Sequence, residues 1–296
     1  MGRTHIRALE GASRVQIVAV AEPNEKAGEA LRALGLAVFG SVAEMLDVGG
    51  FDGVLIAAPS DQHLELIQKV ASAGLPILCE KPCGVSPIQT REAGVIAQEH
   101  NVRLQIGYWR RFVPALQELR TRILNNDLGT VFHVACAQWD EIPPPARFRE
   151  HSGGIFVDMG VHEIDQVRWL TGQEVTDVAV SAVPWRGAAA GVRDCDSAQA
   201  LLTLSGGSSA VISLGRFHPA GDSVTTEVFG SEDHARIVIL DPHDGTAPQL
   251  DALRRQAEAF ADAVAGGYVD GATVGDAEIA LAVAEQLSIA SGLATH

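Results

Sequence analysis

Residues 53–60 read Gly-Val-Leu-Ile-Ala-Ala-Pro-Ser, and residues 76–82 read Pro-Ile-Leu-Cys-Glu-Lys-Pro. Each stretch is a short apolar run that ends in polar residues, and the segment from 60 to about 73 has the pattern of a helix. Strands that alternate with helices and are apolar throughout form a parallel sheet covered on both faces. This part of the chain therefore predicts a doubly wound, Rossmann-like domain.

The alternation extends on both sides of this stretch and stops near residue 110. Before that point, strands are expected at 15–21, 37–39 and 102–107, and helices at 25–34, after Asn24, at 86–99 and in a short segment after Ser41. Beyond it, strands are expected at 130–139, 175–184, 196–204, 209–216, 223–230 and 234–240, and helices at 113–126, 155–171, 249–265 and 275–291. Runs of strands with segregated helices are typical of an α+β domain with a mostly antiparallel sheet. We therefore place a dinucleotide-binding domain at 1–110 and an α+β domain at 111–296.

The composition argues against several classes of partner. The chain has 296 residues, with 37 acidic and 22 basic ones and a formal net charge of −15, which repels phosphate backbones and disfavours nucleic acid. Its four cysteines have no paired CxxC spacing, which argues against a disulfide framework and a structural zinc site. The longest charge-free stretch, 197–215, contains Gly206-Gly207 and predicts two strands and a turn rather than a membrane span. The first residues lack the apolar run of a signal peptide, so we expect a cytoplasmic protein.

The beginning of the predicted Rossmann domain differs from the usual pattern, which is a strand followed by Gly-x-Gly-x-x-Gly. Only Met1-Gly2 precede helix-like sequence, and Glu22 follows Gly2 at the spacing expected for an acid that binds a ribose. If Gly2 is the third glycine, the first strand and two glycines are absent. Losing about four buried apolar side chains would cost roughly 6–12 kcal/mol. We therefore expect the true start to lie upstream; the alternative is that the helix begins the protein and another strand fills the position.

Lys81 stands at the end of a predicted strand, on the edge where doubly wound sheets bind ligands. It is one of only three lysines, with Lys26 and Lys69, among the 22 basic residues. The following proline keeps its backbone extended. A lysine in a partly desolvated cleft can stabilise a developing alkoxide. The alternative is a surface lysine paired with Glu80 or Glu99.

Asp158 and His162 are four residues apart in the predicted helix 155–171 and would share one face. An imidazole suits proton transfer near neutral pH, and Asp165, one turn further on, could orient it. The alternatives are an ion pair on the helix surface, a buried histidine tied to Asp165, and a metal site. The metal site would need more convergent ligands than the sequence offers.

The turn Ala58-Pro59-Ser60-Asp61-Gln62-His63 follows another predicted strand of the sheet. Its serine hydroxyl and helix N-terminus could face a cofactor ribose or amide, or the serine could be an ordinary helix cap. Glu22 could accept hydrogen bonds from a ribose diol or help to cap the helix after Asn24. A 2′-phosphate would be repelled by Glu22, so NAD is favoured over NADP.

Tyr108-Trp-Arg-Arg-Phe112 lies at the predicted domain junction. Its arginines, Arg110 and Arg111, could contact substrate or pair with nearby acids. Cys79 and Cys83 flank the lysine motif and are interpreted as packing residues, because a nucleophilic cysteine needs a positioned base.

Taken together and in this order, the motifs resemble the Gfo/Idh/MocA family of oxidoreductases, most closely its inositol dehydrogenase branch. They are the strand ending at Glu22, Ala-Pro-Ser-x-x-His63, Glu80-Lys81-Pro82, Gly107-Tyr-x-Arg-Arg-Phe112 and Gly154-x-x-x-Asp158-x-x-x-His162-x-x-Asp165. The resemblance spans nearly the whole chain. It implies a Rossmann domain and a second domain whose open antiparallel sheet binds substrate and forms homodimers or homotetramers.

The resemblance also implies an NAD(P)-dependent dehydrogenase that acts on a CH–OH group of a cyclic polyol or sugar. His162 would take the hydroxyl proton, Asp158 would position His162 or the substrate, and Lys81 would polarise the oxygen. The implied cofactor-binding residues are Gly2, Glu22, Pro59, Ser60, His63, Glu80 and Lys81. The implied substrate-binding residues are Lys81, Tyr108, Arg110, Asp158 and His162, with no metal.

The sequence departs from the family in two places and leaves other functions open. The glycine-rich loop is absent apart from Gly2, and the connection at Asp241–Pro248 is short. The alternatives are a non-catalytic protein that senses dinucleotide or sugar, a truncated inactive form, and an enzyme that uses bound NAD in a closed redox cycle.

Overall fold

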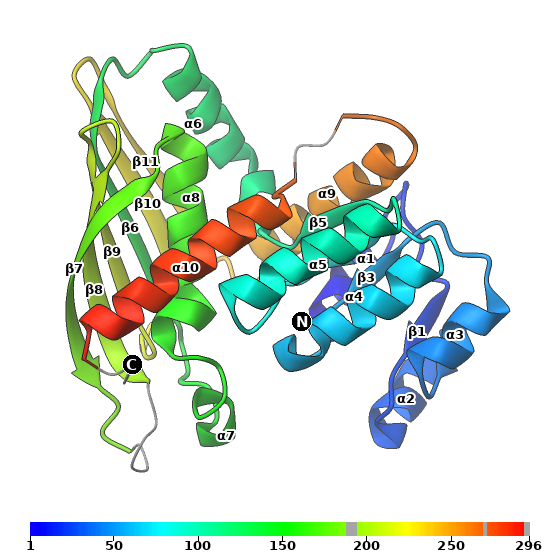
Figure 1. Ribbon diagram of the computed structural model, residues 1–296. Coiled ribbons are helices and arrows are strands. Elements are labelled where there is room, and N and C mark those ends of the chain that lie inside the picture. Colours follow the sequence, from blue (N-terminus) through cyan, green and yellow to red (C-terminus); the bar gives the residue numbers. More distant parts are fainter. Residues whose placement is uncertain (188–193, 269–270, 293–296) are drawn as a thin grey trace. The chain divides into compact units, whose positions relative to one another are not determined.

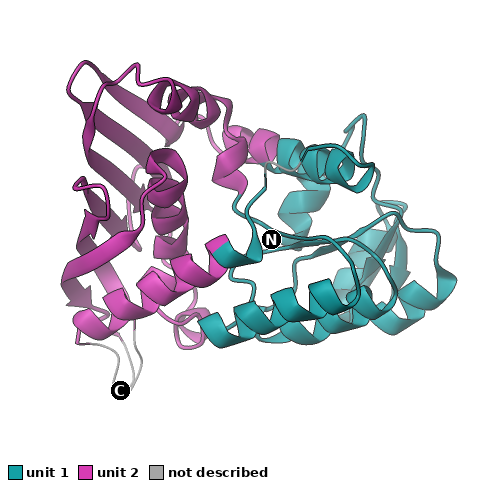
Figure 2. Ribbon diagram, turned by 45° about the horizontal axis from the view of Figure 1, so that its top comes forward, with its two compact units in different colours: residues 1–108, 253–275 teal, residues 109–252, 276–296 magenta. Residues whose placement is uncertain are grey.

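A computed structural model describes residues 1–187, 194–268 and 271–292. The chain divides into two compact units, which are coloured separately in Figure 2. Unit 1 comprises residues 1–108 and 253–275, and unit 2 comprises residues 109–252 and 276–296. In the described part of the chain, no helix has the length and apolar content needed to cross a membrane.

Unit 1 contains five short parallel strands, which confirms the Rossmann-like prediction (Figure 1). They are β1 (Ala19–Ala21), β2 (Ala37–Phe39), β3 (Val54–Ile56), β4 (Ile77–Cys79) and β5 (Leu104–Ile106). β1 pairs with β2, and β3, β4 and β5 form a separate sheet in that order. The break between the two sheets lies between β1 and β3. In the general doubly wound order 3-2-1-4-5-6, this is the position of the strand numbered 1, between the strands numbered 2 and 4. β1 is shorter than the expected strand 15–21, because its partner β2 offers only three residues to pair with.

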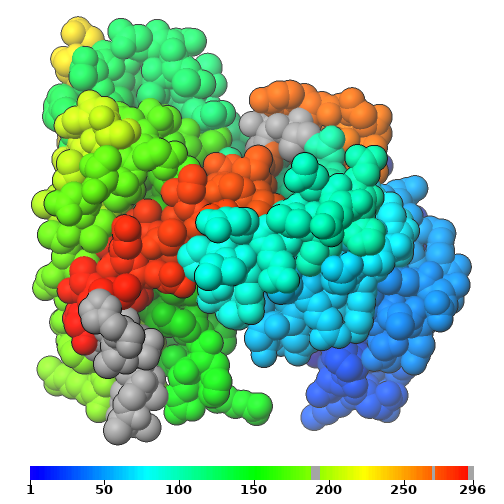
Figure 3. All heavy atoms as spheres, in the orientation of Figure 1, coloured from blue at the N-terminus to red at the C-terminus, as the bar shows by residue number. Residues whose placement is uncertain are grey.

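The helices of unit 1 begin where local chemistry predicts. They include α1 (Gly2–Leu9), α2 (Glu25–Arg32), α3 (Val42–Val48), α4 (His63–Ser72) and α5 (Pro87–Glu99). The side chains of Asn24 and Ser41 accept hydrogen bonds from the backbones of α2 and α3, as expected of N-caps. α4 begins at His63 rather than at Ser60, which lies in a preceding 3₁₀ turn. α4 and α5 lie side by side on the surface (Figures 1 and 3).

Unit 2 is built on a six-stranded sheet in the order β11-β10-β6-β9-β8-β7. The strands are β6 (Val131–Trp139), β7 (Val175–Pro184), β8 (Cys195–Leu204), β9 (Ser209–Gly215), β10 (Ser223–Gly230) and β11 (His234–Leu240). All neighbours are antiparallel except β6 and β9, which confirms the mostly antiparallel prediction. The other helices of the chain are α6 (Pro114–Leu124), α7 (Ala146–Arg149), α8 (Val161–Thr171), α9 (Ala247–Val264) and α10 (Val274–Ala290).

One face of the unit 2 sheet is the main core of that unit. Along β8 the side chains alternate: Ala200 and Leu202 are buried, whereas Leu201 is 49% exposed. α8 contacts β6 on the buried face (Figure 1), and its residues from Val161 to Leu170 are all buried. The period-two alternation of β8 therefore places one set of its residues in the core and the other on the opposite face of the sheet.

Replacing Leu202 by alanine is expected to lower the free energy of unfolding by about 2–5 kcal/mol, because it leaves a cavity in this core. Leu201→Ala, one residue earlier on the other face, is expected to change it by about 0.5 kcal/mol or less. Urea unfolding of both variants measures the difference. Equal losses would mean that the register of β8 assigned here is wrong.

Candidate active site

The carboxyl ends of the unit 1 strands carry the residues expected to bind a dinucleotide. β3 and β4 are parallel, so Ser60 and Lys81 follow them at the same edge of the sheet. Lys81 is half-buried, and its backbone N–H donates to Oε2 of Glu80 at 3.2 Å. The Lys81–Pro82 peptide bond is cis. The predicted Glu80-Lys81-Pro82 motif is therefore a turn at the ligand-binding edge of this sheet.

Glu22 follows β1 directly, where a ribose-binding acid is expected. Its Oε1 accepts a hydrogen bond from the backbone N–H of Asn24 at 2.9 Å, so it helps to cap α2 as the alternative predicted. A carboxylate can accept several hydrogen bonds, and this one contact leaves capacity for a hydroxyl. A Cβ added to Gly2 would meet nothing within 4 Å, so the space beside the start of α1 is open. These residues fit a bound dinucleotide.

His63 and Glu80, both expected to bind cofactor, are buried instead. His63 Nδ1 lies 2.8 Å from the carbonyl oxygen of Pro82, and Nε2 lies 2.9 Å from that of Ala58. Glu80 Oε1 lies 2.6 Å from Nε2 of His5, in α1. The polar atoms of both side chains are therefore engaged by the protein itself.

Asp158 and His162 lie in unit 2, at the start of the predicted helix 155–171. The first turn of this helix, Phe156–Gly160, is π-helical, and α8 begins after it, so the two residues are not on one continuous α-helix. Gly153 and Gly154, with φ of 80° and 87°, lead into the turn. Single π-helical turns occur often at functional sites.

His162 is 7% exposed, and its ring packs edge to face against Trp109, with 6.4 Å between the ring centroids. Asp158 Oδ2 accepts a hydrogen bond from Nη1 of Arg216 at 2.5 Å. Both residues are thus held by side chains from distant parts of the sequence.

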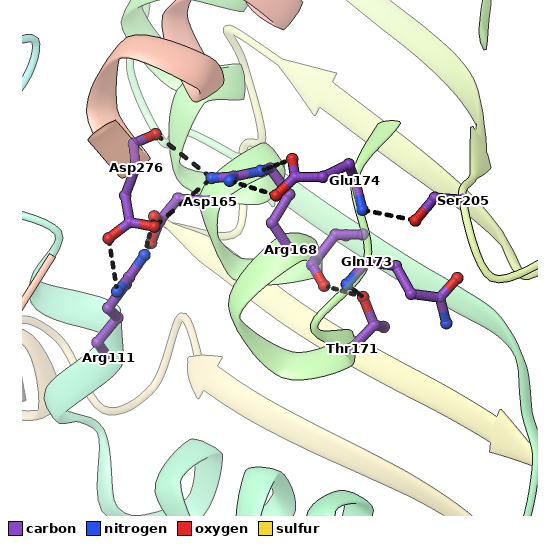
Figure 4. Close-up of polar contacts among 9 residues, drawn as sticks. Arg111, Asp165, Arg168, Thr171, Gln173, Glu174, Ser205 and Asp276 are labelled. Atoms are coloured by element: carbon purple, nitrogen blue, oxygen red, sulfur yellow. Dashed lines mark hydrogen bonds and ion pairs between the residues drawn. The ribbon is translucent and has the colours of Figure 1, made fainter. Parts of the chain in front are cut away.

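Asp165, which could have oriented His162, pairs with Arg111. Nε and Nη2 of Arg111 donate to its two oxygens at 2.9 and 2.5 Å. Figure 4 shows that Arg111 also faces Asp276, which contacts Arg168 in turn. Burial would lower the pKa of Arg111, but the two carboxylates raise it. Arg111 is therefore a permanent cation inside unit 2.

Arg110 and Tyr108, expected to bind substrate, are buried as well. Arg110 donates from Nη1 to Oε1 of Glu163 and from Nη2 to Oε1 of Gln138, each at 2.5 Å. This agrees with the alternative that the arginines pair with nearby acids.

An ionic network that the sequence did not predict lies behind Asp158. Arg216 Nη2 donates to Oδ1 of Asp194 at 3.1 Å, and Oδ2 of Asp194 accepts from Nε of Arg149 at 2.5 Å. Arg149 also contacts Asp196 at 3.0 Å. Burial would lower the pKa of Arg216, but Asp158 and Asp194 raise it. Arg149 and Asp194 are 45 residues apart, so no local spacing could have predicted the network.

The cysteines do not contribute a nucleophile. All four are buried and free, and burial raises the pKa of Cys136 and of Cys195 to about 12. Burial also raises the pKa of Cys79, beside Cys83. A thiolate is the reactive form, so the raised pKa keeps Cys79, Cys136 and Cys195 unreactive near neutral pH. The burial of Cys79 and Cys83 agrees with their interpretation as packing residues. Among the residues that the structure describes, His, Cys, Asp and Glu form no cluster suited to a metal ion.

Asp194→Asn is expected to lower the free energy of unfolding by about 3–5 kcal/mol, because it leaves two buried guanidinium groups with one carboxylate fewer. Asp196→Asn is the control: this side chain is 43% exposed, and its loss should cost about 1 kcal/mol or less. Urea unfolding near neutral pH compares them, and similar values for both would contradict the network.

Comparisons with known proteins identify the family of the chain. A family model described as "Oxidoreductase family, NAD-binding Rossmann fold" matches residues 1–108, and "GFO/IDH/MocA C-terminal domain" matches residues 116–236. The "Rhizopine catabolism protein MocA" of Rhizobium meliloti is 48% identical, over 96% of this chain and 90% of its own length. The "Myo-inositol dehydrogenase Hyg17" of Streptomyces leeuwenhoekii is 33% identical, over 92% of this chain and 89% of its own.

Among solved structures, myo-inositol 2-dehydrogenase from Lactobacillus plantarum superposes with a TM-score of 0.85 at 27% identity. The match covers 99% of this chain and 94% of the other. The resemblance drawn from the sequence is confirmed, and so is the assignment of NAD as cofactor. The chain belongs to the GFO/IDH/MocA family of oxidoreductases, and its N-terminal part is an NAD-binding Rossmann domain.

Proposed function

We propose that the protein is a dehydrogenase that oxidises a secondary alcohol of a cyclic polyol related to inositol. The observation that carries the proposal is that the groups such a reaction needs are present and held by buried partners. Lys81 lies in a turn fixed by Glu80, His162 packs against Trp109, and Asp158 is paired with Arg216. The names of the relatives point to the same class of substrate.

In this proposal His162 accepts the proton of the substrate hydroxyl, and a base so placed contributes roughly 10²–10⁴-fold. The Lys81 ammonium donates to the same oxygen and stabilises the negative charge that develops on it. Asp158, held by Arg216, orients His162 or a neighbouring hydroxyl. Bound NAD supplies the nicotinamide carbon that accepts the hydride. Glu22 favours NAD over NADP, since its carboxylate would repel a 2′-phosphate.

The experiment is a titration of the protein with NADH, followed by nicotinamide fluorescence, and then an absorbance assay with NAD and a panel of inositols and sugars. The panel includes a rhizopine, because the relative with 48% identity is named for rhizopine catabolism. We expect saturable NADH binding and turnover of one or a few cyclic polyols. Binding without turnover of any of them would overturn the proposal in favour of a sensing protein.

Lys81→Ala is expected to lower kcat by about 10²–10³-fold, the usual effect of removing a donor to a developing oxyanion. Lys81→Arg should be nearly as damaging, because the broad guanidinium misplaces the donor. The control is Lys69→Ala: Lys69 is exposed and pairs with Glu65 one helical turn away. Steady-state kinetics compare the three, and wild-type turnover in Lys81→Ala would rule out this role.

A further inference from the structure

The turn that carries Lys81 is embedded between strand ends. The backbone N–H of Glu80 donates to the carbonyl oxygen of Ile56 at 2.9 Å, and that of Gly107 donates to the carbonyl oxygen of Cys79 at 2.7 Å. A Cβ on Gly107 would lie 3.1 Å from Cα and 3.2 Å from Cδ of Glu80. The end of β3 therefore holds Glu80 through its backbone. Gly107, directly after β5, holds Cys79 and packs closely against Glu80, whose side chain has little room to move.

A histidine fixes the carboxylate of Glu80. His5 is 2% exposed and lies 2.6 Å from Oε1 through its Nε2. An ionised carboxylate only accepts hydrogen bonds, so in this contact Nε2 of His5 is the donor. The other oxygen, Oε2, accepts from the backbone N–H of Lys81. One carboxylate thus connects the imidazole of His5 to the backbone of Lys81.

A second histidine fixes the other end of the turn. His63 is 1% exposed, and its Nδ1 lies 2.8 Å from the carbonyl oxygen of Pro82. Its Nε2 lies 2.9 Å from the carbonyl oxygen of Ala58, after β3. Both partners are carbonyl oxygens, which only accept, so a neutral imidazole donates to one of them. A hydrogen bond to Pro82 places the proton on Nδ1. A hydrogen bond from Nδ1 therefore ties the residue after Lys81 to the start of α4.

We propose that His5 and His63 are positioning residues that hold the Glu80–Pro82 turn from both sides, so that the Lys81 ammonium is placed for reaction. The inference rests on the proposed role of Lys81, and both histidines act through the turn. It replaces the expectation that His63 and Glu80 bind the cofactor directly. Since a misplacement of about 1 Å can cost roughly 10²-fold in rate, loosening either contact should reduce kcat strongly.

The two contacts use different ring nitrogens, which gives a crossed test. The amide nitrogen of asparagine lies where Nδ1 of histidine would be, and that of glutamine lies where Nε2 would be. At His5, which bonds through Nε2, glutamine should preserve the contact and asparagine should lose it. At His63, which reaches Pro82 through Nδ1, the order is reversed. We expect kcat to fall by about 10²-fold in His5→Asn and His63→Gln and to stay near wild type in His5→Gln and His63→Asn.

A second readout does not depend on turnover. The chain has three lysines, so labelling lysine with ¹⁵N gives three backbone amide signals, and Lys81→Arg identifies that of Lys81. This amide donates to Glu80 Oε2, so its chemical shift is sensitive to a change in the geometry of the turn. The shift should move in His5→Asn and His63→Gln and stay in the other two variants. His100→Asn and His100→Gln are controls, because His100 is exposed at the end of α5.

The proposal is supported if glutamine preserves the wild-type amide shift and kcat better than asparagine at His5, and asparagine preserves them better than glutamine at His63. Equal effects of asparagine and glutamine at both positions, or an unmoved Lys81 signal in all four variants, would overturn it. If one variant does not fold, as a thermal melt reveals, the pair at the other histidine decides. A wild-type protein that turns over no polyol would refute the proposed function, whereas the Lys81 signal still decides whether the histidines hold the turn.

Discussion

A charged group buried in this protein needs an opposite charge or a hydrogen bond beside it, and that requirement decides where the reactive side chains lie. Removing a carboxylate from water costs several kcal/mol unless it is paired. Glu80 meets the requirement by sharing its oxygens between His5 and the backbone of Lys81. Asp158 meets it through Arg216. The reactive groups are therefore held by partners that take no part in the proposed chemistry.

The need to pair buried charges also explains why the chain has many arginines and few lysines. Of the 22 basic residues three are lysines, so 22 − 3 leaves 19 arginines. A planar guanidinium satisfies two carboxylate oxygens at once, as Arg111 does with Asp165, and it stays charged when buried. Lys26 and Lys69 are exposed, and Lys81 alone is half-buried. This distribution supports the proposed role of Lys81 in the reaction.

Local patterns were sufficient to predict most of the fold and part of the site. Capping by Asn24 and Ser41 and the strands of unit 2 follow from spacing over a few residues. The partner of Asp158 could not be predicted, because Arg216 lies 58 residues away and only the folded sheet brings the two together. The i, i+4 rule also misjudged the first turn of the helix, where a π-helical turn replaces the α-helical spacing. Asp165 was expected to orient His162, but its partner is Arg111, 54 residues away in the sequence, which local spacing could not predict.

The contact between His5 and Glu80 makes the short helix α1 important for the position of Lys81. A helix of eight residues is too short to be stable alone, so its position depends on tertiary contacts. Its buried side chains are His5, Ala8 and Leu9, and of these His5 supplies the specific polar contact. The His5–Glu80 contact that orients Glu80 also stabilises the position of α1, because its coupling free energy acts equally on the two partners. Any displacement of α1 therefore reaches Glu80, and through its second oxygen the backbone of Lys81.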